Sequence, residues 1–148
     1  MTRVELAQAC IDKYGAEKQK LKMVEEMAEL TQRVCQFQNG RFVQDQVAEE
    51  IADCLAVLDG MDILFGVAEN HEDTYTGFTG YKILLITIGN IQFWLPRDHG
   101  VGWEKQTMGS LFYLLRLELM GLSKEIGQDK VDTWRQIKAD RMEERLKI

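Results

Sequence analysis

The chain has 148 residues, of which 45% are hydrophobic and 28% are charged, a composition typical of a folded globular protein. Its formal net charge of −6 argues against a partner that is a nucleic acid polymer, because such a partner requires a basic surface. The longest apolar run, Ile83 to Ile88, is too short to cross a bilayer, and the N-terminus lacks the apolar core of a signal peptide. We therefore expect a cytoplasmic protein with no membrane partner.

Three cysteines, Cys10, Cys35 and Cys54, fall within apolar helical patterns and form no CxxC pair. This spacing predicts buried free thiols in a reducing compartment, and neither disulfides nor zinc ligands.

Abundant helix formers and a single proline, Pro96, predict an all-α fold with one domain over residues 1–148. An Asn39-Gly40 turn separates the second and third helices, and Gly40 suits the left-handed position that follows a helix. The first three predicted helices cover, in chain order, about Arg3 to Lys13, Ala16 to Gln38 and Val43 to Gly66.

The polar, glycine-rich segment from Gly66 to Gly80 predicts a loop. In the helix after it, the run ILLITI is also compatible with a buried strand, because periodicity cannot separate the two over so few residues. Asp129 is a candidate N-cap for the last helix. The last three predicted helices cover about Tyr81 to Leu95, Glu104 to Ile126 and Asp129 to the C-terminus.

An acidic motif occurs twice, as VEEMAEL at 24–30 and as AEEIADC at 48–54. Each motif places two acids at i and i+3, on the flank of an apolar helical stripe. The acid pairs are Glu26 with Glu29 and, 24 residues later, Glu50 with Asp53. The two stripes have the same phase and consist of Met23, Met27, Leu30, Val34 and Phe37, and of Val47, Ile51, Cys54, Leu58 and Met61.

The turn at Gly40 should bring the two acid pairs to the same level. Glu29 precedes Gly40 by 11 residues and Glu50 follows it by 10. Glu26 precedes Gly40 by 14 residues and Asp53 follows it by 13. Packed helix axes lie about 8–10 Å apart, a gap that two glutamate side chains can span. The sequence therefore predicts an antiparallel hairpin with four carboxylates along one side of its seam.

Four gathered carboxylates repel one another, so either their pKa values rise or a cation neutralises them. A ligand set of oxygens without histidine suits Mg²⁺, or Mn²⁺, better than zinc. Because Mg²⁺ accepts phosphate oxygens as ligands, such a site also implies a phosphorylated ligand. The alternative is that the acids form ordinary solvated i, i+4 ion pairs, Lys22 with Glu26 and Glu29 with Arg33.

The segment YGAEKQKLKMVEEMAEL, followed by VAEEIADCLAVL, resembles the MazG-like all-α nucleoside triphosphate pyrophosphohydrolases, particularly the small phage and prophage forms. The family signature, EExxE on one helix and ExxD on the next, is matched at 25–29 and 50–53. The resemblance covers roughly Ala16 to Phe65 and, more weakly, the last helix. It implies an enzyme that uses Mg²⁺ to release pyrophosphate from a nucleoside triphosphate or modified nucleotide, leaving the monophosphate.

The resemblance also implies roles for individual residues. Glu25 becomes the base that activates water, and the metal ligands become Glu26, Glu29, Glu50 and Asp53.

Family members carry basic residues on the last helix that meet the phosphates. Here the matching basic residues at i, i+3 and i+7 are Lys138, Arg141 and Arg145. Alternatively, these three are solvated and pair with neighbouring acids of their own helix, namely Asp140, Glu143 and Glu144. Gln19 and Lys22, which lie before the acids on the same side of their helix, are further candidates for substrate contact.

The chain departs from the small family members at residues 69–128, an insert that contains two additional helices. The insert either lines a base pocket or replaces a subunit contact, and its apolar segments predict burial in the bundle or at an interface. We expect a homodimer or homotetramer. The rival functional prediction is a non-catalytic helical interaction or regulatory module with a degenerate acidic metal site.

Overall fold

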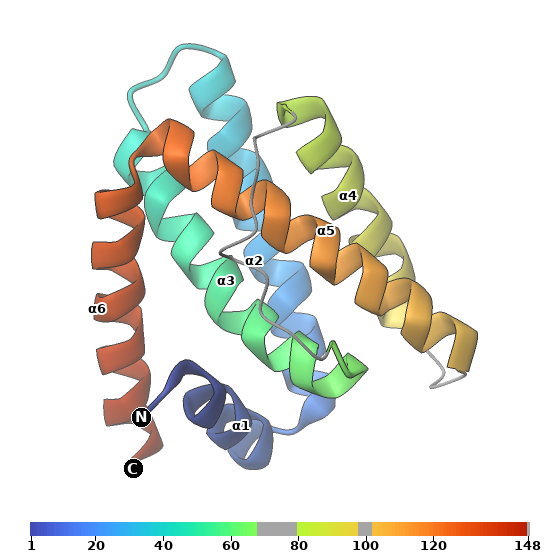
Figure 1. Ribbon diagram of the computed structural model, residues 1–148. Coiled ribbons are helices and arrows are strands. Elements are labelled where there is room, and N and C mark those ends of the chain that lie inside the picture. Colours follow the sequence, from blue (N-terminus) through green and yellow to red (C-terminus); the bar gives the residue numbers. More distant parts are fainter. Residues whose placement is uncertain (68–79, 98–101, 148) are drawn as a thin grey trace.

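The computed structural model describes residues 1–67, 80–97 and 102–147, and these residues form helices and no strand (Figure 1). The predicted all-α fold is therefore confirmed, and the ILLITI run is helical. The elements are α1 (Arg3–Tyr14), α2 (Ala16–Gln38), α3 (Gln44–Phe65), α4 (Tyr81–Trp94), the short 3₁₀ segment η2 (Leu95–Arg97), α5 (Gly102–Ile126) and α6 (Gln128–Leu146). Most of the predicted loop between Gly66 and Gly80 lies outside the described residues.

The prediction that Asp129 caps the last helix is wrong. Only Gly127 separates α5 from α6, and it occupies the N-cap position with a φ of 134°. This backbone conformation strains any residue with a Cβ, so glycine makes the tight connection. Asp129 lies instead in the first turn of α6, where its negative charge interacts favourably with the positive end of the helix dipole.

Helices α2 and α3 form the predicted antiparallel hairpin at the centre of the bundle (Figure 1). Gly40, with a φ of 84°, takes the left-handed conformation in the turn between them. The two apolar stripes meet in one core, and within them only Phe37 is not fully buried. The phase of the stripes thus decides which face of each helix the acids occupy.

Helix α6 packs along α3. The two helices run parallel, as the order of their contacts shows: successive residues of α6 contact successive residues of α3. The Trp134 indole donates a hydrogen bond to Asp45 at 3.3 Å, and the Lys138 ammonium donates to Glu49 at 2.9 Å. Helix α1 lies against the C-terminal part of α6, where the Lys13 ammonium donates to the Arg145 carbonyl at 2.8 Å. These contacts place basic residues of α6 beside the acids of α3.

The insert covers the opposite side of the hairpin. Helix α5 crosses α3, and α4 forms the outer edge of the bundle, on the side away from α6 (Figure 1). The buried Arg116 of α5 donates to Asp59 at 2.9 Å and to Asp62 at 2.6 Å, which ties α5 to α3. Both insert helices bury apolar side chains in the common core, among them Ile88 and Phe112.

Two of the three cysteines, Cys10 and Cys54, are buried free thiols as predicted. The prediction was wrong for Cys35, which is exposed because it lies one residue beyond the buried stripe position Val34. No helix among the described residues combines the length and apolarity that crossing a bilayer requires.

The core of the hairpin provides a stability prediction. Leu30 is completely buried, whereas Leu21 on the same helix is 64% exposed. We expect Leu30→Ala to lower the free energy of unfolding by about 2–5 kcal/mol, because it removes buried methyl groups and leaves a cavity. The matched control, Leu21→Ala, should change it by less than about 0.5 kcal/mol. Chemical denaturation measures both, and equal losses would contradict this core assignment.

Candidate metal centre and adjoining cavity

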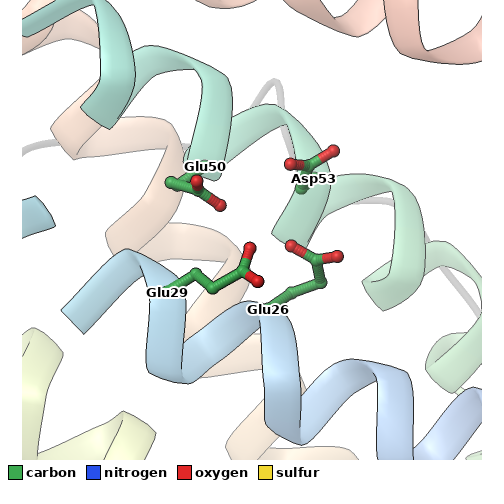
Figure 2. Close-up of side chains that lie close together, drawn as sticks. All are labelled: Glu26, Glu29, Glu50 and Asp53. Atoms are coloured by element: carbon green, nitrogen blue, oxygen red, sulfur yellow. The ribbon is translucent and has the colours of Figure 1, made fainter. Parts of the chain in front are cut away.

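The hairpin brings the four predicted acids together. Glu26 and Glu29 project from α2 and Glu50 and Asp53 from α3, and their carboxylates turn toward a common centre (Figure 2). One carboxylate oxygen from each of the four residues lies within 4.8 Å of the others. This convergence follows from the equal spacing of the two motifs from the Gly40 turn.

The cluster is withdrawn from solvent. Glu26 is only 4% exposed, and Glu50 and Asp53 are partly buried. Among the described residues, the buried atoms that lack a hydrogen-bond partner include Oε2 of Glu26 and Oε2 of Glu50. A buried carboxylate oxygen without a donor is costly, and a cation would satisfy it. The donor set is therefore suited to a hard divalent ion.

Burial and mutual repulsion change the acidity of the cluster. Burial raises the pKa of Glu50 to about 8, and the charges of Asp53, Glu29 and Glu26 add to this effect. Burial likewise raises the pKa of Glu26 to about 7, opposed by its hydrogen bond with Lys22. Asp53 also has a raised pKa because it is buried, although Lys138 opposes the shift. At neutral pH the metal-free cluster therefore carries less than its full negative charge.

Two lysines lie against the cluster. The Lys22 ammonium is 2.9 Å from a carboxylate oxygen of Glu26 and 3.4 Å from one of Glu25. The Lys22–Glu26 pair of the alternative prediction therefore exists, but its acid is buried and part of the cluster rather than solvated. From α6, the Lys138 ammonium lies 3.2 Å from Asp53 and 2.9 Å from Glu49. Lys138 thus pairs with acids of α3, and the alternative of a pairing within α6 does not describe it.

Cys54 lies behind the acids. Its thiol is fully buried, and burial together with the charges of the four carboxylates raises its pKa well above the ordinary value. A neutral thiol in this position is a packing group and a poor metal ligand.

A cavity of about 540 Å³ adjoins the cluster, between α1, α2, α3 and α6. Glu26 and Asp53 line it, so the acidic cluster borders the cavity directly. All five residues predicted to contact substrate line it as well, namely Gln19, Lys22, Lys138, Arg141 and Arg145. In the described part of the insert, no residue lines this cavity, so the possibility that the insert forms its wall is not supported.

The cavity has a strongly basic wall. Seven of its lining residues are cationic: Arg3, Lys18, Lys22, Arg135, Lys138, Arg141 and Arg145. Three acids line it, Glu26, Asp53 and Asp59, and the last of these pairs with Arg116. The whole chain has a net charge of −6, yet this cavity concentrates positive charge beside an acidic cluster. Such an environment suits a polyanion that is bound together with a cation.

Several of these cavity residues were not predicted from the sequence. Arg135 is one turn before Lys138 on the same face of α6, so extending the basic pattern backwards would have found it. No sequence pattern indicates that Arg3 lies at the cavity, because only the packing of α1 against α3 and α6 brings it there. Glu49 belongs to the second acidic motif, and no sequence pattern indicates that it pairs with Lys138.

Glu25 lies at the outer edge of the cluster. Its side chain is 58% exposed and contacts the cluster through Lys22, and it does not line the cavity. The structure thus separates Glu25 from the four convergent acids.

Comparison of this chain with known protein families, with curated proteins and with solved structures finds no match. The resemblance to the MazG-like family stays a prediction that rests on the quoted motifs.

The raised pKa values predict how the metal-free protein responds to pH. Glu50 binds a proton below about pH 8 when folded, but only below its ordinary value of 4.5 when unfolded. Between these values the folded state holds more protons, so its stability falls as the pH rises. We expect the free energy of unfolding to decrease from pH 5 to pH 8 by up to about 1.4 kcal/mol per pH unit for each such proton.

Glu50→Gln is the matched variant, because it removes the titrating group and keeps the side-chain size. Urea denaturation in the presence of a chelator should give a shallower decline over the same pH range. Parallel profiles for the two proteins would show that Glu50 does not titrate in this range.

Proposed function

We propose that this protein is a metal-dependent nucleotide pyrophosphohydrolase that cleaves a nucleoside triphosphate or modified nucleotide to its monophosphate and pyrophosphate. The observation that supports this most directly is the junction of two environments in one site. Four carboxylates converge, and two of them, Glu26 and Asp53, line a cavity that also has seven cationic lining residues. A site of this kind has complementary charges for a divalent ion and for the phosphate chain that the ion accompanies.

In this proposal Glu26, Glu29, Glu50 and Asp53 hold Mg²⁺, with Mn²⁺ as an alternative. The two carboxylate oxygens without hydrogen-bond partners, on Glu26 and Glu50, favour this assignment. The bound ion would neutralise negative charge on the phosphate chain and so make its phosphorus atoms more open to attack.

The basic residues of the cavity would bind the phosphates directly. Arg141 and Arg145 can donate paired hydrogen bonds to phosphate oxygens, which fixes orientation as well as charge. Lys22 and Lys138 already neutralise Glu26 and Asp53. When a cation takes over that task, both ammonium groups become available for phosphate oxygens at the same end of the cavity.

Glu25 is the proposed acceptor of the proton from the attacking water. The water oxygen forms a bond to the α-phosphorus, the bond between the α- and β-phosphates breaks, and pyrophosphate leaves. The exposed side chain of Glu25 can pass the accepted proton to bulk solvent. Positioning and charge neutralisation supply most of the acceleration in this class of reaction, which matches what the basic wall and acidic cluster offer.

Metal binding is the first test of this proposal. Isothermal titration calorimetry with Mg²⁺ and Mn²⁺ should detect a site in the wild type. In Asp53→Asn, which removes a charged oxygen from the cluster, the affinity should fall by at least about tenfold. Asp132→Asn is the matched control, because Asp132 is exposed on α6, accepts a hydrogen bond from Gln128 and does not belong to the cluster. Equal affinities in all three proteins would refute the assigned ligand set.

Hydrolysis is the second test. A panel of nucleoside triphosphates and modified nucleotides, incubated with Mg²⁺ or Mn²⁺, should yield pyrophosphate and a monophosphate. Glu29→Gln should lower kcat/KM by about a hundredfold or more. Glu17→Gln makes the same change in the first turn of α2, where Glu17 pairs with Lys20, and should have no effect.

A panel without any turnover, or an unchanged rate in Glu29→Gln, would remove the enzymatic proposal. Metal binding without turnover would then support the rival assignment, a non-catalytic module that binds ions or a partner. Glu25→Gln separates the two roles of the acids, because it should lower kcat while metal affinity stays at the wild-type level.

A further inference from the structure

Helix α4 has an outer face that the described bundle leaves uncovered. The helix reads YKILLITIGNIQFW and contains one charged residue, Lys82. Its inner face is buried in the core through Leu84, Ile88 and Ile91. A helix that is apolar all round normally has neighbours on all sides, but α4 forms an edge of the bundle (Figure 1).

The exposed positions on α4 follow a regular pattern. Ile83, Ile86, Asn90 and Phe93 are exposed and are separated by steps of three, four and three residues, and the exposed Arg97 of η2 follows four residues later. This is the spacing of the a and d positions of a coiled-coil seam. Asn90 is then the single polar residue at an internal position of the stripe, where a polar side chain restricts how two such helices can align. We call these five residues, with Trp94 beside them, the α4 stripe.

Aromatic groups make one end of the stripe well defined. The rings of Phe93 and Trp94 meet edge to face with their centroids 5.0 Å apart. The Arg97 guanidinium lies over the Phe93 ring, 4.2 Å from its centroid. Aromatic residues and arginine are the side chains most enriched in the centres of protein interfaces.

We propose that two copies of this chain associate through the α4 stripe, as an antiparallel helix pair with its twofold axis beside Asn90. A seam with regular a/d spacing is complementary to itself, as a twofold interface requires. In the antiparallel orientation the two helix dipoles point in opposite directions, which is favourable. This orientation also places Ile86 of one copy against Phe93 and Trp94 of the other. Gly89, exposed next to Asn90, leaves space for a close approach at the axis.

The exposed area agrees with this occupant. Ile83, Ile86, Phe93 and Trp94 are between 42% and 51% exposed, so together they present on the order of 350 Å² of apolar surface. A stable interface buries about 800 Å² per partner and is a little more than half apolar. The stripe therefore supplies most of the apolar area that a dimer requires. The polar ends around Lys82 and Arg97 would form the polar rim of the interface.

This association does not depend on the proposed catalytic function. The cavity and the acidic cluster are formed by α1, α2, α3 and α6, and no described residue of α4 lines them. Each copy would thus carry a complete candidate site on the side away from the interface. Metal binding and self-association can therefore fail independently.

Light scattering during size-exclusion chromatography tests the proposal on the full chain. The wild type should have twice the chain mass of 17.1 kDa. Ile86→Glu together with Phe93→Glu should weaken the dimer by about a hundredfold or more, because two pairs of unpaired charges would be buried. Leu21→Glu, at an exposed apolar residue outside the stripe, should remain dimeric. A monomeric wild type at high protein concentration would overturn the proposal.

Cross-linking tests the position of the axis without disturbing the stripe's charge. In a Cys35→Ser background, Asn90→Cys should form a disulfide-linked dimer on mild oxidation. Ile83→Cys should not, because antiparallel pairing separates its two copies by about 20 Å along the seam. Equal cross-linking at both positions would refute the antiparallel register.

Vesicles test the competing occupant. A monomer that sediments with vesicles of neutral or anionic lipid would show that the stripe faces a bilayer, and would overturn the pairing of two copies.

Discussion

The mutual repulsion of four carboxylates is the constraint on which the rest of this structure depends. The hairpin of α2 and α3 cannot pair its apolar stripes without also bringing Glu26, Glu29, Glu50 and Asp53 together. Their repulsion has to be relieved, and the described residues relieve it in two ways. Lys22 and Lys138 provide positive charge at the edges, and the pKa values of the most enclosed acids rise so that protons reduce the charge. Apolar residues of similar size would be less costly to bury at these positions, so the acidic cluster lowers the stability of the metal-free fold.

The two sides of the α2–α3 hairpin are covered by different helices, which have different roles. On one side α1 and α6 approach the hairpin and enclose a basic cavity that adjoins the acids. On the other side α4 and α5 bury the hairpin's remaining apolar surface and anchor it through Arg116, Asp59 and Asp62. The parallel alignment of α6 with α3 matters most for the site, because it turns Lys138 toward Asp53 and aligns Arg141 and Arg145 with the cavity. The uncovered face of α4 lies on the opposite edge, where an assembly leaves the cavity unobstructed.

Local patterns were sufficient to predict most of the helices, because most are periodic and end at glycine or proline. The ILLITI run of α4 was the exception, since its periodicity also allowed a strand. The level of the acids was also predictable, since Gly40 fixes the turn and helical geometry fixes the rise per residue. The errors arose where neighbouring elements override a local preference. Gly127 took the cap position that Asp129 was expected to occupy, since a connection of one residue requires a positive φ. Cys35 is exposed although it lies in an apolar pattern, since it falls just outside the stripe that packs.

The sequence by itself determined the all-α class, the hairpin and the meeting of its four carboxylates, because these depend on helical period and on one short turn. Only the tertiary structure decided what surrounds that cluster. The burial of Glu26, the pairing of Lys138 with Asp53, and the arrival of Arg3 beside Arg141 depend on contacts between segments far apart in the chain. No local period encodes such contacts, because they are selected by how whole helices pack. The acids could therefore be found from spacing alone, whereas the basic cavity that gives them a candidate substrate could not.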